Sequence, residues 1–131
     1  MGVASGGPPI LTFHALDGAA APDSFPPDRF ARGMAALHAR GYRAIDLLDL
    51  VEALRNDAPL PERAFVLTFD DGCDSVYAQA APILARYDWT ATIFLVTGEE
   101  GRKSDSDRLP GVSGRRMMSW REIDDLRMAG H

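Results

Sequence analysis

Apolar and polar residues follow one repeating plan along this chain. A short apolar run comes first, and a longer segment follows in which apolar residues recur every three or four positions. The runs are typical of strands and the longer segments of helices, because side chains repeat with a period of 2 in a strand and 3.6 in a helix. The order is strand 10–13, helix 28–41, strand 42–45, helix 46–56, strand 65–69, helix 82–87, strand 90–96 and helix 119–130. Helices between successive strands predict a parallel α/β sheet, built as a barrel or as a doubly wound sheet and cut short after four units.

Polar residues stand where these helices should begin. Asp28, Asp46 and Asp74 can each accept a hydrogen bond from the first amides of a helix. Ser119 and Glu122 have the spacing of a capping box. The apolar faces expected to turn inward are Phe30, Met34 and Leu37, then Leu47, Leu50, Val51 and Leu54, and finally Trp120, Ile123 and Leu126. A short turn is expected around Val76 and Tyr77, and His131 would begin a fifth strand.

The strand at 65–69 ends in a pair of carboxylates. Its mostly apolar residues predict a strand covered on both faces, and Asp70, Asp71 and Gly72 follow at once. Ligands bind at the carboxyl ends of parallel strands, and Gly72 allows the backbone to turn sharply there. Because Asp74 is better placed as a helix cap, the pair is left for a functional role. Adjacent side chains on a strand point to opposite faces, so one carboxylate can bind a cation while its neighbour acts as general base.

The bulk composition is that of one soluble globular domain spanning residues 1–131. The chain is 46% hydrophobic and 25% charged, and its net charge of -5 argues against binding to a nucleic acid backbone. The single cysteine, Cys73, excludes an internal disulfide and is most simply a small filler residue. The first nine residues lack the features of a signal peptide, and no apolar run has a membrane-spanning length. We therefore expect no membrane span and, for the chain as written, a cytoplasmic location.

Three histidines and one loop are the remaining candidates for a site. His14 follows the first strand and should face the same pocket as Asp70, either as a site residue or as a satisfied structural histidine. His38 has polar neighbours on its helix and is expected to be solvated. The polar loop 98–114 should be mobile and lie at the same end of the sheet as the acidic pair.

The hexapeptide at 67–72, Leu-Thr-Phe-Asp-Asp-Gly, resembles the first motif of the polysaccharide deacetylases, carbohydrate esterase family 4, also called the NodB homology domain. The resemblance continues, in the family's order, through segments 77–82, 91–96, 118–123 and 129–131, and upstream through 10–14 and 30–54, which are similar to the branch acting on exopolysaccharides. It implies an amino-terminal portion of a deacetylase-type distorted barrel, that is, a partial (β/α) barrel.

Carried over position by position, the resemblance makes Asp70 the general base and Asp71 a carboxylate ligand of a divalent metal, usually zinc. It implies removal of acetyl groups from the N-acetylated amino sugars of a polysaccharide or oligosaccharide. The family's other two metal ligands are histidines separated by three residues, and His131 is similar to the histidine that precedes them. We therefore expect an incomplete zinc site, and an isolated chain that is inactive and binds zinc weakly.

Other classes of protein stay open on the residues alone. A phosphate-transferring fold also uses acidic residues after a buried strand, although its spacing and position differ. A non-catalytic carbohydrate-binding or interaction fragment would bind through aromatic surface, with Trp120 as a candidate. The incomplete barrel that the resemblance implies would leave a strand edge unpaired, so we expect some self-association.

Overall fold

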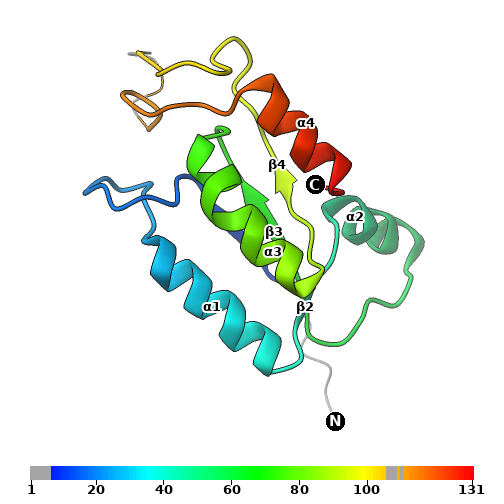
Figure 1. Ribbon diagram of the computed structural model, residues 1–131. Helices are drawn as coiled ribbons and strands as arrows, with labels where there is room; N and C mark the ends of the chain where they lie inside the picture. The colour runs from blue at the N-terminus through cyan, green and yellow to red at the C-terminus, as the bar shows by residue number, and fades with distance from the viewer. Residues whose placement is uncertain (1–6, 106–108, 110) are drawn as a thin grey trace.

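The computed structural model describes residues 7–105, 109 and 111–131. Four strands alternate with helices in the predicted order (Figure 1). The elements are β1 (Ile10–Phe13), α1 (Pro27–Ala39), β2 (Arg43–Ala44), α2 (Leu47–Asn56), β3 (Ala64–Phe69), the π-helical turn η1 (Val76–Ala80), α3 (Ala81–Tyr87), β4 (Thr92–Ile93) and α4 (Trp120–Met128). None of the helices among these residues combines the length and the apolar character needed to cross a membrane.

The sheet is parallel and is built around β3. All four residues of β1 pair with one side of β3, with Ile10 opposite Val66 and Phe13 opposite Phe69. β2 and β4 both pair with the other edge, β2 at the start of β3 and β4 at its end. Ile45 N–H donates to Phe65 O, and Phe94 N–H donates to Phe69 O four residues further along. This arrangement confirms the predicted parallel α/β sheet.

The core lies where α1 and α3 cover the sheet. Every residue of β3 is buried, as expected for a strand covered on both faces. The Phe13 and Phe30 rings meet edge to face at 5.1 Å, and Phe69 packs against both. The two helices run side by side in Figure 1, and His38 of α1 stacks on Tyr87 of α3 at 4.5 Å. The apolar faces of the helices therefore hold β3, and the turn after it, in one place.

Two of the four predicted helix caps are confirmed and two are wrong. The Asp46 carboxylate accepts from Leu48 N–H, and Ser119 and Glu122 form the full capping box. α1 instead begins after Pro26, so Asp28 lies inside its first turn and pairs with Arg32 at 2.7 Å. Asp74 makes no cap, because its carboxylate pairs with Arg116 at 3.0 Å.

Some residues predicted to point inward lie at the surface. Leu54 is 66% exposed because the buried face of α2 is centred on Leu50 and Ala53 and does not extend to it. Trp120 is 65% exposed because it is the first residue of α4, whose buried contact is made a turn and a half later by Leu126. These two predictions are wrong for the same reason: the buried face of each helix is narrower than the apolar face predicted from its sequence.

The fourth strand is shorter than predicted, and the fifth strand expected to begin at His131 stays a prediction. Only Thr92–Ile93 form β4, although the backbone hydrogen bonds to the β3 side continue through Phe94 and Val96. Phe94 itself is 51% exposed. His131 follows α4 as irregular backbone, and its Nδ1 accepts a hydrogen bond from Ala91 N–H at 3.1 Å.

Candidate functional site

The acidic pair lies in a tight turn at the carboxyl end of β3. Asp70 N–H still donates to Phe13 O of β1 at 2.9 Å, and the chain then turns through positive φ values at Asp71 (76°) and Gly72 (81°). A Cβ on Gly72 would lie 2.7 Å from Leu95 Cδ2. The turn therefore favours glycine for its conformation, and a side chain there would also have to displace the end of Leu95.

His14 faces Asp70 across the ends of two neighbouring strands. Because β1 and β3 are parallel and Phe13 pairs with Phe69, the residues that follow the two strands lie at the same carboxyl end of the sheet. His14 Nε2 lies 3.7 Å from Asp70 Oδ2, beyond a direct hydrogen bond, and the two side chains are 38% and 36% exposed. An imidazole and a carboxylate therefore meet at a point that solvent or a ligand can reach.

The segment after loop 98–114 holds the acidic turn from the other side. Met118 N–H donates to Gly72 O and Asp74 N–H donates to Arg116 O, both at 3.0 Å. Cys73 and Met117 form an antiparallel bridge between these hydrogen bonds. The predicted position of the loop at the acidic end of the sheet is therefore right for its described residues. Its mobility stays a prediction, and residues 106–108 and 110 lie outside the described residues.

Cys73 is a packing residue, as predicted. Its side chain is buried with Ala15, Val112 and Met117 in a small apolar cluster beneath the turn. Burial raises the pKa of the Cys73 thiol to about 11, and the nearby Asp71 carboxylate acts in the same direction. The thiol is therefore protonated at neutral pH and is no nucleophile.

Arg115 is a member of this site that the sequence reasoning missed. Its side chain is only 12% exposed and reaches Asp17 Oδ2 at 3.1 Å and Asp23 Oδ2 at 3.2 Å. Burial disfavours the guanidinium charge, but the hydrogen bonds and charges of Asp23 and Asp17 outweigh it and raise the pKa of Arg115. Desolvation acts against the ionised Asp17 as well, yet hydrogen bonds from Ser24, Ala19 and Arg115 lower its pKa. The sequence signal was the adjacent pair Arg115-Arg116 in a chain of net negative charge.

The described residues do not form a three-ligand metal site. No group of three or more histidine, cysteine, aspartate or glutamate side chains among them lies close enough to hold one ion. His131 contacts Ala91 at the start of β4, the opposite end of the strand from the acidic turn, and burial lowers its pKa. His38 stacks on Tyr87 at the surface. Of the three histidines, only His14 lies beside the acidic pair.

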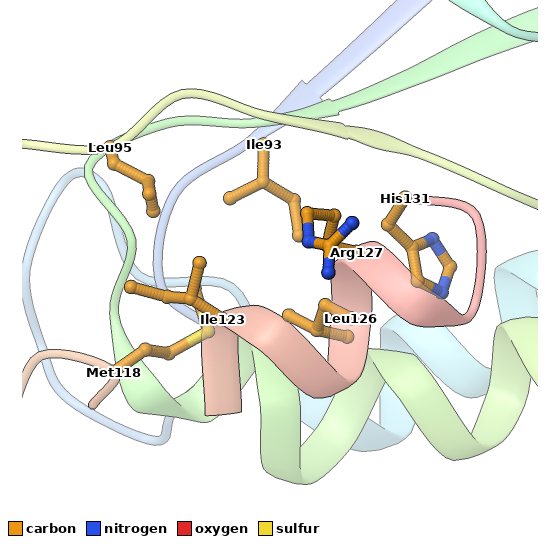
Figure 2. Close-up of a pocket in the computed structure, with 7 residues that line it drawn as sticks. All are labelled: Ile93, Leu95, Met118, Ile123, Leu126, Arg127 and His131. Carbon is orange, nitrogen blue, oxygen red and sulfur yellow. The ribbon is translucent and has the colours of Figure 1, made fainter. Parts of the chain in front are cut away.

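An apolar pocket of about 190 Å³ lies between β4 and α4 (Figure 2), and it borders the acidic turn through Leu95 and Met118. Its lining residues are Ile93, Leu95, Met118, Ile123, Leu126, Arg127 and His131. Neither carboxylate of the pair lines it, and its walls offer no acid and base facing each other. The candidate site is therefore the acidic turn with His14.

Comparison with known proteins points to one family. The family model for polysaccharide deacetylase matches residues 57–131. A poly-beta-1,6-N-acetyl-D-glucosamine N-deacetylase of Escherichia coli (strain K12) is 46% identical over 55 residues, which are 42% of this chain and 8% of that protein. The Bacillus subtilis (strain 168) protein YxkH is 32% identical over 95 residues, covering 72% of this chain and 34% of its own length.

Solved structures share the fold. IcaB from Ammonifex degensii superposes with a TM-score of 0.79 at 27% identity, over 95% of this chain and 49% of that one. A de-N-acetylase from Aggregatibacter actinomycetemcomitans superposes with a TM-score of 0.74 at 19% identity, over 93% of this chain and 51% of that one, and its likeness speaks for the fold alone. This chain thus spans about half the length of these structures, which confirms the predicted partial barrel of deacetylase type. The family match covers the acidic turn and everything after it, and the chain belongs to the polysaccharide deacetylase family.

Proposed function

We propose that this chain provides the base-bearing part of the active site of a hydrolase that removes acetyl groups from the N-acetylated amino sugars of a polysaccharide. The observation that carries the proposal is the meeting of Asp70 and His14 at 3.7 Å, on the ends of paired parallel strands and beside Asp71. The family match and the name of the Escherichia coli relative support this class of reaction.

Asp70 is proposed as the general base. A carboxylate at this exposed strand end can accept the proton of a water molecule as that water attacks the acetamide carbon. His14 is proposed as the facing pocket residue, whose imidazole can return a proton to the departing amine of the sugar. The two groups lie 3.7 Å apart and both side chains are more than one third exposed, so a single substrate group can reach both.

The proposal also includes a divalent metal, most simply zinc, with Asp71 as one carboxylate ligand. Catalytic zinc is usually held by three protein ligands, and the described residues do not bring three such donors together. The ligand proposed from these residues is therefore Asp71 alone, which lies in the turn after the buried strand. The proton transfers assigned to Asp70 and His14 stand on their own geometry.

The test is acetate release from an N-acetylated β-1,6-linked glucosamine oligosaccharide, with zinc supplied and then removed by a chelator. The chain is assayed alone, and also fused at His131 to the part of Bacillus subtilis YxkH beyond the region that matches this chain. We expect zinc-dependent release from the fusion, its loss in Asp70→Asn, and little release from the chain alone. Asp74→Asn, which changes a neighbouring carboxylate paired with Arg116, should leave release intact. Equal activity in Asp70→Asn and the parent fusion contradicts the assigned base.

A second candidate is a non-catalytic carbohydrate-binding or interaction fragment. Two observations favour it: no three-donor metal set exists among the described residues, and the Trp120 indole is largely exposed. Exposed indole faces can stack on sugar rings. Oligosaccharide binding that survives both chelator and Asp71→Ala but is lost in Trp120→Ala would support this candidate. Binding lost in Asp71→Ala and kept in Trp120→Ala would support the hydrolase.

A further inference from the structure

The candidate site is assembled from two segments far apart in the sequence. His14 belongs to the loop between β1 and α1, whereas Asp70 and Asp71 belong to the turn after β3. β1 and β3 fix where each segment leaves the sheet, but His14 and Asp71 lie beyond the last paired residues, Phe13 and Phe69. Something further has to fix their side chains relative to each other.

Arg115 binds the His14 loop at three side chains. Its Nε donates to Asp17 Oδ2 at 3.1 Å, one terminal nitrogen pairs with Asp23 Oδ2 at 3.2 Å, and the other donates to Ser24 Oγ at 2.5 Å. We call Arg115 with these three partners the Arg115 clamp. Asp23 also accepts from Ala15 N–H through its backbone oxygen, so the clamp closes the loop directly behind His14.

The same arginine is tied to the acidic turn. Arg115 donates to Gly111 O, and a Cβ on Gly111 would lie 3.9 Å from Asp71 Oδ2. The residues immediately after it pair antiparallel with the turn, through Met118 N–H to Gly72 O and Asp74 N–H to Arg116 O. The buried apolar cluster that includes Ala15, Cys73 and Met117 lies between the two segments.

We propose that Arg115 is a positioning residue, which fixes the loop carrying His14 against the turn carrying Asp70 and Asp71. A planar guanidinium with five fixed N–H donors can serve two carboxylates, a hydroxyl and a carbonyl at once, and a lysine cannot. The clamp also holds Asp17 and Asp23 as ion pairs, so their charges are compensated beside a site that already has two carboxylates. The importance of the Arg115 clamp for catalysis rests on the proposed function, whereas its role in holding the loop against the turn does not.

The experiment compares Arg115→Gln with Arg116→Gln in the full 131-residue chain. Arg116 is a matched control, because it is the next residue and pairs with Asp74 and Glu122 on the exposed side of the same segment. Two readouts are taken by NMR: the ring signals of His14 and amide hydrogen exchange across the chain. We expect Arg115→Gln to shift the His14 ring signals and to speed exchange about tenfold at Ala15 and Phe25, whose amides close the loop.

A merely structural arginine would not give that pattern. Arg116→Gln should leave the His14 signals unchanged, and Leu50 in α2 should exchange at the parent rate in both variants. Arg115→Lys keeps the positive charge but lacks the planar guanidinium with its several N–H donors. Its His14 ring signals and its exchange rates at Ala15 and Phe25 should lie between those of the parent and those of Arg115→Gln. Unchanged His14 signals, or acceleration spread evenly over α2 and the loop, would overturn the proposal.

A second variant covers the case in which Arg115→Gln fails to fold. Asp23→Asn leaves the arginine and removes one of its two carboxylate partners. The same two measurements are made on it, and the same results support or overturn the proposal. Neither measurement requires turnover. If the fusion to YxkH releases no acetate, the proposed function is contradicted and the Arg115 clamp is not affected. If the expected changes in the His14 signals and in amide exchange do not occur, the Arg115 clamp alone is contradicted.

Discussion

Gly72 follows the two carboxylates at a backbone angle that a side chain would strain. Its φ is 81°, and an added Cβ would meet the Leu95 side chain at 2.7 Å. We expect Gly72→Ala to lower the free energy of unfolding by about 1–3 kcal/mol, measured by urea denaturation. Gly33→Ala is the control, because Gly33 lies inside α1 with no atom within 4 Å of an added Cβ. That change should stabilise the chain by about 0.5–1 kcal/mol. Equal losses in both variants would contradict the strain argument.

His131 gives the stability of the chain a dependence on pH. Its imidazole is partly buried and accepts from Ala91 N–H through Nδ1, and burial lowers its pKa below the ordinary value of 6.5. As the pH falls, the unfolded chain therefore takes up this proton before the folded chain does. The contribution of the neutral His131 to the free energy of unfolding is fully present above pH 6.5 and is lost as the pH falls towards the pKa of the folded chain. We expect the loss of Tm between about pH 7 and pH 5 to be smaller in His131→Gln than in the parent.

The control for that measurement is His38→Gln. His38 is exposed on α1, where its ring stacks on Tyr87 and stays in contact with water. Its substitution removes a surface ring and leaves the contact between His131 and Ala91 in place, so it separates the effect of the buried imidazole from the effect of losing any histidine. If the Tm falls by the same amount in His131→Gln and in the parent, the buried imidazole is not the source of the pH dependence.

At the scale of the elements, the capping box of α4 is a prediction from sequence that can be measured. Ser119 Oγ accepts from Glu122 N–H while the Glu122 carboxylate accepts from Ser119 N–H. Ser119→Ala should lower the free energy of unfolding by about 1 kcal/mol in urea denaturation. Asp28→Ala is the comparison, since Asp28 has a cap-like sequence position but lies inside the first turn of α1 and pairs with Arg32 at the surface. Its removal should leave stability nearly unchanged, and a larger loss there than at Ser119 would contradict the assignment.

Local signals predicted the elements better than they predicted their faces. The order of strands and helices follows from apolar periodicity, and Asp46 and Ser119 mark true helix starts. Leu54 and Trp120 fit the same periodicity and yet lie at the surface, because how far a helix is covered depends on neighbours that periodicity does not reveal. The carboxylate pair stood out from the sequence because no packing role explained it.

The rest of the site depends on contacts between distant segments. His14 was predicted to face Asp70, since parallel strands end at one edge, but its 3.7 Å approach depends on the register of β1 against β3. Arg115 could not be connected to Asp17 from sequence, because 98 residues separate them. Only the fold brings the loop after β1 and the segment before α4 to the same corner.

At the scale of the whole molecule, the sheet has two free edges within the described residues. β3 takes β1 on one side and β2 with β4 on the other, and β1 and β4 pair with no further strand there. An unpaired edge offers backbone donors and acceptors to another chain, and apolar side chains beside it strengthen the contact. Phe94 and Leu95 are exposed directly after β4, next to the apolar pocket of Figure 2. We therefore predict self-association through one surface, the β4 edge.

We expect the chain to associate reversibly through this edge at micromolar concentration or above, and Phe94→Lys to shift it towards monomer. A lysine on an edge strand opposes pairing because its charge would be buried by the second chain. Leu48→Lys is the matched control: Leu48 is 70% exposed, more than Phe94, but it lies on α2 away from the edge. Sedimentation velocity over a range of concentrations measures the mass of each variant. If exposed apolar area alone drove association, Leu48→Lys would reduce the mass at least as much as Phe94→Lys, whereas an effect confined to Phe94→Lys identifies the edge. A parent chain that stays monomeric throughout would refute the prediction.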